Sequence, residues 1–353
     1  MIERREDLVT IQALRAVAAL MVVAYHAAGQ WGGHLASLDE EGVWPNGSAG
    51  VDIFFVISGL VMAISASRIA SRPQAWRIFF SRRLARIVPM YRVTTTVKIL
   101  AVLALPAFVA RTRLDPMYVL GSYLFVPVRD AAGVSAPVLP VGWTLSFEMT
   151  FYVLVAAALF LRLSLFRVAA PVLLALAILA IVRRPNWPAV AALANVIVLE
   201  FLFGAVIGAR LLRGTVLPTL AAGALLPLAF AVIVAIPVGS GTLRIVTWGV
   251  PAAAIVAAAV ALEHRLGPAL PPWLLRLGDA SYSIYLTHGF VVPVVVLLVV
   301  HAHLPKLAAL LAIIIGCIVA SAIVGLLAYA GVEHPLLRYH RRKSLQKAFV
   351  ATQ

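Results

Sequence analysis

About ten apolar stretches, each near 20 residues long, run through this 353-residue sequence and limit what it can fold into. A run of that length crosses the hydrocarbon core of a bilayer as one helix, which satisfies its own backbone hydrogen bonds there. Hydrophobic residues make up 63% of the chain and charged residues only 12%, a balance that excludes a soluble domain. The sequence therefore predicts an all-α, polytopic transmembrane helical bundle of about ten spans, with nine or eleven left open. The expected spans are 8–29, 50–70, 85–109, 142–162, 167–183, 189–211, 216–237, 242–263, 280–300 and 307–330.

The basic residues predict how the bundle is oriented. The net charge is +15, and most of the Lys and Arg residues fall in alternate short loops, as cytoplasmic loops require. This distribution favours both termini in the cytoplasm and makes nucleic acid an unexpected partner. Some arginines do not fit, because they lie in loops assigned to the opposite side: Arg111, Arg113 and Arg129 before the fourth span, and Arg183 and Arg184 after the fifth.

A single transmembrane domain over residues 1–353 is expected, with 334–353 as a short basic cytoplasmic tail. The first apolar run is too long for a signal-peptide core, so it is expected to stay as a span. One cysteine, Cys317, permits no disulfide framework within the chain. His301 and His303 lack the spacing of a metal site, and no metal is predicted.

Arg15 and His26 interrupt the first expected span. A charge near the middle of a span costs roughly 2.5–3.5 kcal/mol on insertion scales, so such residues indicate a functional site. At the helical rise they lie about 16 Å apart, too far to pair, with Arg15 toward the cytoplasm and His26 toward the outside. Since adjacent spans run antiparallel, Asp52 is expected at the depth of His26. Contact between them would orient the imidazole as a general base, and the alternative is that Asp52 caps its helix.

Three arginines enter the third span in "FFSRRLARIVPMY". Arg82 fits ordinary cytoplasmic charge, whereas Arg83 and Arg86 are three residues apart and share one helical face. Arginine binds phosphate oxygens bidentately, so this face, joined by Arg15 from the same side, predicts a site for an anionic cytoplasmic ligand.

Glu148 falls within the fourth span, on its outer half, roughly level with His26 and Asp52. A buried carboxylate without a partner would neutralise itself, so Glu148 is expected to bind a polar group. His288, near the middle of the ninth span, is either a ligand-facing residue or a core histidine bonded to neighbouring backbone.

Six segments carry a resemblance to a known family: "IQALRAVAALMVVAYH", "GVDIFFVISGLVM", "RRLARIVP", "WTLSFEMTFYVL", "LGDASYSIYLTH" and "VEHPLL". In this order, over nearly the whole chain, they resemble acyltransferase family 3. That family consists of bacterial integral-membrane enzymes that move an acyl group, usually acetyl, from acyl-CoA to a sugar hydroxyl. The wording "LPVGWTLSFEMTFY" is similar to the exopolysaccharide-production branch.

The resemblance implies roles for individual residues. The family's first-helix Arg and His fall on Arg15 and His26, its R-x-x-R on Arg83 and Arg86, and its carboxylate on Glu148. The chain has "FEMT" where "VEEQ" is commoner in the family, so a second acidic residue is missing after Glu148. Some members of the family carry an added soluble hydrolase-like domain, and none is expected here.

The predicted function is O-acetylation of a cell-surface or exported polysaccharide, or its lipid-linked precursor, at the bacterial inner membrane. Acetyl-CoA is the expected co-substrate, bound by Arg15, Arg83 and Arg86. The remaining expected partners are the carbohydrate acceptor and the lipid bilayer, with homo-oligomerisation left open. The expected catalytic residues are His26, Asp52 and Glu148, and the expected substrate-binding residues are Trp143 and His288.

A transporter or flippase of a glycan or lipid-linked sugar is the alternative, although no internal repeat or clearly broken helix favours it. A structural subunit of a polysaccharide assembly complex is disfavoured by the many ionisable residues at depth.

Overall fold

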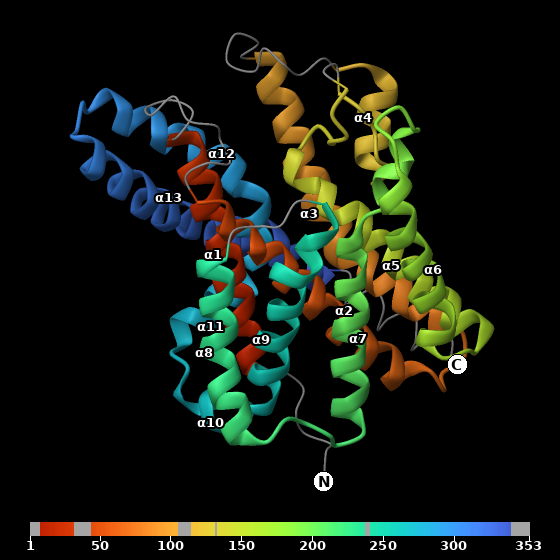
Figure 1. The fold of residues 1–353 in the computed structure, drawn as a ribbon. Coiled ribbons are helices and arrows are strands. Elements are labelled where there is room, and N and C mark those ends of the chain that lie inside the picture. Colours follow the sequence, from red (N-terminus) through yellow and green to blue (C-terminus); the bar gives the residue numbers. More distant parts are fainter. Residues whose placement is uncertain (1–7, 32–43, 105–113, 131–132, 237–240, 340–353) are drawn as a thin grey trace.

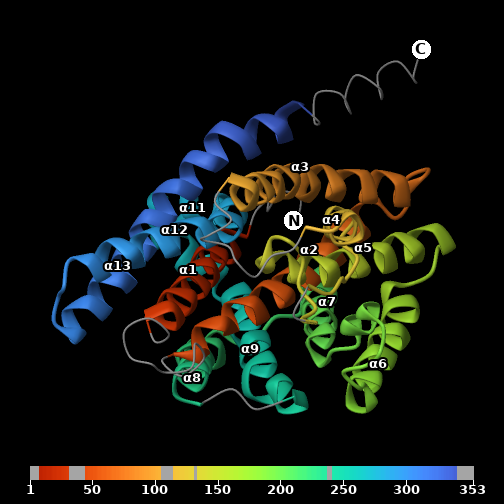
Figure 2. The ribbon, with the colours of Figure 1, turned by 90° about the horizontal axis from the view of Figure 1, so that it is seen from above.

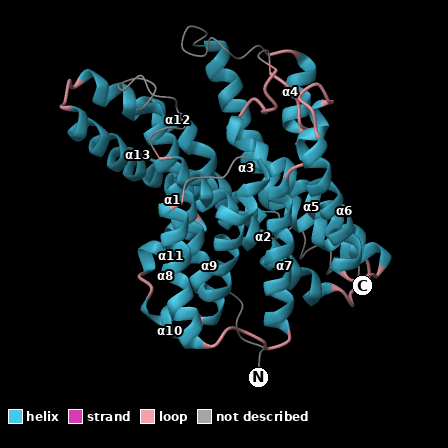
Figure 3. Ribbon diagram, viewed as in Figure 1, coloured by secondary structure: helices cyan, strands magenta, loops and turns pink. Residues whose placement is uncertain are grey.

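A computed structural model describes residues 8–31, 44–104, 114–130, 133–236 and 241–339, and within these residues it contains helices and no strand (Figure 3). The longer helices are α1 (Val9–Trp31), α2 (Gly50–Ile69), α3 (Ala75–Ala104), α5 (Trp143–Leu161), α6 (Leu165–Val182), α7 (Leu199–Leu212), α8 (Thr219–Ala235), α9 (Val250–Ala261), α12 (Ser281–His301) and α13 (Lys306–Ala328). Shorter helices are α4 (Pro116–Tyr123), α10 (Glu263–Leu266) and α11 (Pro272–Asp279). Short 3-10 segments are η2 (Pro45–Ala49), η4 (Pro140–Gly142), η5 (Ala189–Leu193), η6 (Val196–Val198), η7 (Gly241–Leu243) and η9 (Gly267–Ala269), and π-helical turns are η8 (Ile245–Gly249) and η10 (Tyr329–Glu333). The expected all-α transmembrane bundle is confirmed.

The number of expected spans is only partly matched. Among the described residues, eight helical segments are long and apolar enough to cross a membrane, and α8 is a shorter apolar helix. The expected span 189–211 breaks into η5, η6 and a 14-residue α7, since Asn195 accepts a hydrogen bond from the backbone of Ile197 and starts a new turn. The third helix begins ten residues before the expected 85, because its arginine-rich first turns are helical although they are not apolar.

Helix α2 lies in the middle of the bundle, between α1 and α9 on one side and α5 and α7 on another (Figures 1 and 2). It packs against α7 with almost no side chain between the backbones. A Cβ added at Gly59 would lie 2.1 Å from the carbonyl oxygen of Phe201, and one at Gly204 would lie 1.9 Å from that of Val56. Small residues permit this close approach, which drives helix association in lipid.

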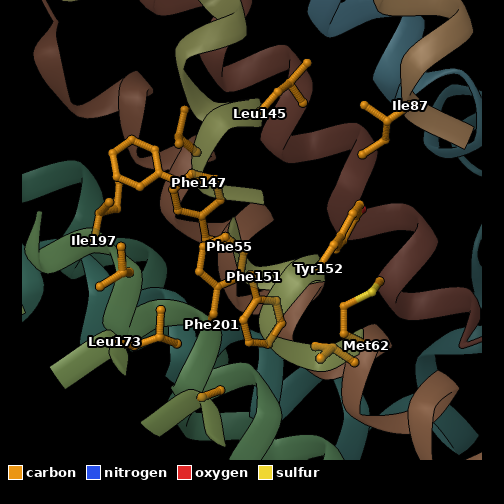
Figure 4. Packing of buried hydrophobic residues seen from close by; sticks show 14 of the residues in the cluster. Phe55, Met62, Ile87, Leu145, Phe147, Phe151, Tyr152, Leu173, Ile197 and Phe201 are labelled. Atoms are coloured by element: carbon orange, nitrogen blue, oxygen red, sulfur yellow. The ribbon is translucent and has the colours of Figure 1, made fainter. Parts of the chain in front are cut away.

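A stack of aromatic rings joins α2, α5 and α7 (Figure 4). The Phe201 ring lies 4.7 Å from that of Phe55 and 4.6 Å from that of Phe151, in both cases nearly parallel. Buried rings at such distances pack strongly, so this stack fixes the three helices relative to one another.

The two described ends of the chain lie on one side of the bundle. The backbone N–H groups of Val9 and Thr10, at the start of α1, donate to the carboxylate of Glu263 in α10 at 2.9 and 3.0 Å. Near the other end, Ser283 at the start of α12 donates to Glu333 at 2.5 Å. Both termini on one side is therefore consistent with the structure, and the assignment of that side to the cytoplasm stays a prediction. Residues 1–7 and 340–353, which hold most of the expected basic tail, lie outside the described residues.

Candidate active site

A cavity between α1, α2, α3, α5 and α12, called here the interhelical cavity, brings together four of the predicted site residues. It encloses about 780 Å³, part of it open to solvent, within the range of small-molecule sites. Its polar lining comprises Arg15, Ser58, Arg83, Arg86, Thr144, Glu148, Tyr152, Tyr282 and Tyr285. The expectation that Arg83 and Arg86 share a face toward Arg15 agrees with this geometry, and Arg82 is exposed outside the cavity.

The interhelical cavity is elongated. Its lining includes both Val51 and Met62 of α2, which at the helical rise lie about 16 Å apart along the helix. Arg83 lies at the Met62 end, where its guanidinium donates to Ser65 Oγ at 2.6 Å and covers the Phe79 ring at 5.7 Å. Thr144 and Tyr285 lie at the other end, with their hydroxyls 3.1 Å apart. A long, thin ligand with a charged group at one end suits this shape.

Glu148 belongs with the arginines of this cavity. The sequence grouped it by depth with His26, but its Oε1 accepts hydrogen bonds from Ser58, at 3.2 Å, and from the Tyr152 hydroxyl. Its other oxygen, Oε2, has no partner among the described residues and is the one left for a ligand. Three cations and one carboxylate thus leave the cavity positive overall.

His26 lies beyond the Tyr285 end of the cavity and does not line it. Its ring is half-buried, 4.8 Å from the ring of Tyr25 and 5.1 Å from that of His288. The His288 ring lies in turn 5.9 Å from that of Tyr285, so a row of three rings continues from the cavity to His26. Neither nitrogen of His26 is hydrogen-bonded to any described residue, which leaves the imidazole available to a substrate.

His288 is buried, with 1% of its surface exposed, and is bonded to neighbouring backbone, as one of the two interpretations expected, whereas a ligand-facing role stays a prediction. Its Nδ1 lies 2.7 Å from the carbonyl oxygen of Tyr285, which can only accept, so Nδ1 carries the proton. Its Nε2 is then an acceptor, and it is buried without a partner in the part of the chain that the structure describes.

The expected contact between Asp52 and His26 is wrong. Asp52 is fully buried, and its two oxygens accept from the guanidinium of Arg244, next to α9, at 3.1 and 2.6 Å. The reason lies in η2, which packs against α1 near Tyr25 and lets α2 begin deeper, with Gly50 against Ala18. Measured along the axis of α1, Asp52 therefore lies more than about 12 Å deeper in the bundle than His26. The alternative cap is also wrong, because no side chain caps α2.

The sequence interpretation missed two charged residues, the half-buried Arg244 and the buried Glu200. Arg244 covers the Trp248 ring at 5.0 Å in addition to binding Asp52, and Glu200 is fully buried in α7. Arg244 falls inside the expected span 242–263 and Glu200 inside 189–211. A charged residue within an apolar span was therefore the feature of the sequence that could have identified them.

A second cavity, called here the loop cavity, lies at the end of the bundle that carries α4 (Figure 1). Trp143 lines it, together with Arg129, Arg183 and Arg184. The first turns of α5 separate the two cavities, because Trp143, Ser146 and Phe147 face the loop cavity while Thr144, Leu145 and Glu148 face the interhelical one.

The structure thus combines an arginine-lined cavity, partly open to solvent, with a nearby histidine pair in a multi-pass helical bundle. The chain belongs to acyltransferase family 3, whose model, described as an acyltransferase domain, matches residues 8–329. It is 34% identical to the exopolysaccharide production protein ExoZ of Rhizobium meliloti (strain 1021) over 324 residues, which cover 90% of this chain and 96% of that protein. No solved structure matches the chain. The chain is therefore an O-acyltransferase.

Proposed function

We propose that this acyltransferase moves an acyl group, most simply acetyl, from cytoplasmic acyl-CoA to a sugar hydroxyl of an exported polysaccharide or its lipid-linked precursor. The observation that carries the proposal is the interhelical cavity, with arginines along it and a row of rings leading from its far end to His26. The printed name of the relative, an exopolysaccharide production protein, supports the class of acceptor. A bacterial inner membrane is the location that this reaction requires.

Acyl-CoA suits the cavity in charge and in length. Its phosphates would be bound by Arg83 and Arg86, with Arg15 adding positive charge, since guanidinium groups pair bidentately with phosphate oxygens. The uncharged pantetheine arm would then follow the 16 Å or so of α2 that lines the cavity. Glu148 Oε2 would accept a hydrogen bond from an amide N–H of that arm or from the acceptor.

The chemistry needs one proton transfer in each direction. His26 removes the proton of the sugar hydroxyl, whose oxygen forms a bond to the thioester carbonyl carbon. The carbon–sulfur bond then breaks, and the departing thiolate takes the proton back from the His26 imidazolium. Among the described residues, Ser58 donates its hydroxyl to Glu148 rather than to a histidine, and Cys317 is buried and does not line the cavity, so direct attack is preferred to an acyl-enzyme. His288, rather than Asp52, is the neighbour that would hold the His26 ring.

The test uses the purified full-length protein in nanodiscs. Acetyl-CoA should raise its thermal midpoint, because a ligand that binds only the folded state stabilises it. With labelled acetyl-CoA and polysaccharide from a deletion strain, mass spectrometry should show label on sugar oxygen. Absence of both effects would overturn the proposal, and a glycan transported without acetylation would point to a flippase instead.

A further inference from the structure

Three of the five arginines that contradicted the loop-charge pattern come together in the loop cavity. The other two, Arg111 and Arg113, lie outside the described residues. Arg129 precedes α5, and Arg183 and Arg184 follow α6, yet all three line one space of about 1210 Å³. In the predicted orientation this space opens on the outer side, where the positive-inside pattern gives arginine no purpose. The described lining contains no Asp or Glu, so the three charges are not neutralised from within the cavity.

Two of these arginines hold the walls in place. The Arg129 guanidinium donates to the carbonyl oxygens of Pro185 and Trp187, which ties the loop before α5 to the loop after α6. Arg183 donates to the carbonyl oxygen of Ala191 at 3.3 Å. Arg184, by contrast, is exposed and its guanidinium has no hydrogen bond or ion pair with a described residue. A guanidinium with all its donors unused beside two others attracts an anion.

The rest of the lining suits a sugar. The half-buried indoles of Trp143 and Trp187 both line the cavity, and the C–H face of a pyranose ring buries apolar area against such rings. Ser135 supplies a hydroxyl and Asn195 an amide, whose Oδ1 is already used by the Ile197 backbone. The side-chain N–H donors of Asn195 are left for a ligand.

We propose that the loop cavity is the acceptor site and that it binds an anionic saccharide, with Arg184 as the ion-pairing residue and Trp143 and Trp187 as stacking surfaces. This inference rests on the proposed function, since it deepens the description of the acceptor. The negative charge belongs either to an acidic sugar or to a phosphate that links the sugar to a lipid, and both offer the same oxygens to arginine. The first turns of α5 form the wall between this cavity and the interhelical cavity.

Equilibrium binding without any acyl donor tests the site directly. The probes are trigalacturonate, neutral trigalactose of the same linkage and a short prenyl-pyrophosphate-linked saccharide, measured by calorimetry on the full-length protein in nanodiscs. Wild type should bind at least one anionic probe about tenfold more tightly than trigalactose. Arg184→Gln should remove that preference, while the matched control Arg213→Gln, at the other end of the bundle, should keep it.

A second variant separates stacking from charge. Trp187→Ala should weaken neutral and anionic saccharides alike, by about fivefold to tenfold, because it removes contact area and leaves the charges. Equal binding of all probes by wild type, or an unchanged preference in Arg184→Gln, would overturn the inference. The inference would also be overturned if phosphatidylglycerol vesicles displaced all bound saccharide. The cavity would then be a site for lipid headgroups.

The two proposals fail in different ways. If wild type transfers label from acetyl-CoA to polysaccharide but Arg184→Gln keeps a normal KM for an anionic acceptor, the acceptor site is wrong and the proposed function stands. If anionic saccharides bind through Arg184 but acetyl-CoA neither binds nor reacts, the proposed function is wrong and the saccharide site stands.

Discussion

The two cavities hold the same number of arginines but are built in different ways. The interhelical cavity takes its arginines from regular turns of α1 and α3, opposes them with one carboxylate and lies inside the bundle. The loop cavity takes its arginines from irregular segments between helices, contains no described carboxylate and has exposed guanidinium groups.

This difference fits the two kinds of ligand proposed above. Charges interact strongly in the interior of the bundle, where little water screens them. In the interhelical cavity one carboxylate among three arginines therefore limits the excess of positive charge, and the ligand is selected by its shape as well as by its charge. At the solvent-exposed end of the bundle, salt screens charges and affinity for one anion is modest, which suits a large acceptor that must leave after the reaction.

The largest effect is expected outside both cavities, at His26. His26→Ala should lower turnover by about 10²–10⁴-fold, the usual contribution of a general base, while acetyl-CoA still raises the thermal midpoint. Turnover of labelled acetyl-CoA and thermal shift, measured on one preparation, check this. Wild-type turnover in the variant would remove His26 from the mechanism.

The next largest effect is expected on stability, at the ion pair of Asp52 and Arg244. Asp52→Asn should lower the free energy of unfolding by about 3–5 kcal/mol, because it removes the carboxylate that is hydrogen-bonded to a largely buried guanidinium. Chemical unfolding in detergent measures it. The double variant Asp52→Asn, Arg244→Gln should recover part of the loss, and simple additivity of the two single changes would contradict the pairing.

Arg86 tests whether the interhelical cavity binds the donor. Arg86→Gln should weaken acetyl-CoA binding about 10–100-fold, as expected for loss of a charge-assisted contact to phosphate. The matched control is Arg82→Gln, four residues away and exposed, which removes the same charge outside the cavity. Equal losses in both variants would show that net charge alone matters.

The smallest effect is expected at Glu148. Glu148→Gln keeps an oxygen to accept from Ser58 and Tyr152 but removes the charge, so kcat/KM should fall by roughly tenfold while stability stays near that of wild type. Steady-state kinetics with varied acceptor measure it. Normal use of donor and acceptor would take Glu148 out of the site.

The helical fold and the interhelical cavity could be predicted because both follow from regular periodicity. Apolar runs of span length locate the helices, and a spacing of three places Arg83 and Arg86 on one face. The breaks near Asn195 and the early start of α3 could not be read from hydropathy, which measures composition rather than backbone hydrogen bonding.

Errors arose where irregular segments set the depth of a helix. The sequence places Asp52 level with His26 only if α2 starts directly at the membrane surface, and the short η2 shifts it inward. The loop cavity was missed for a related reason. Arg129 and Arg184 are more than 50 residues apart in sequence, and only the folded loops bring them to one space, although their unexpected charge was visible from the start.

The shared wall at the start of α5 has a further consequence. One turn of α5 carries Trp143 on the face toward the loop cavity and Thr144 on the face toward the interhelical cavity. A ligand that displaces this turn would therefore change the shape of both cavities. If a ligand in one cavity changes the affinity of the other cavity by some factor, the ligand of the second cavity must change the affinity of the first by the same factor.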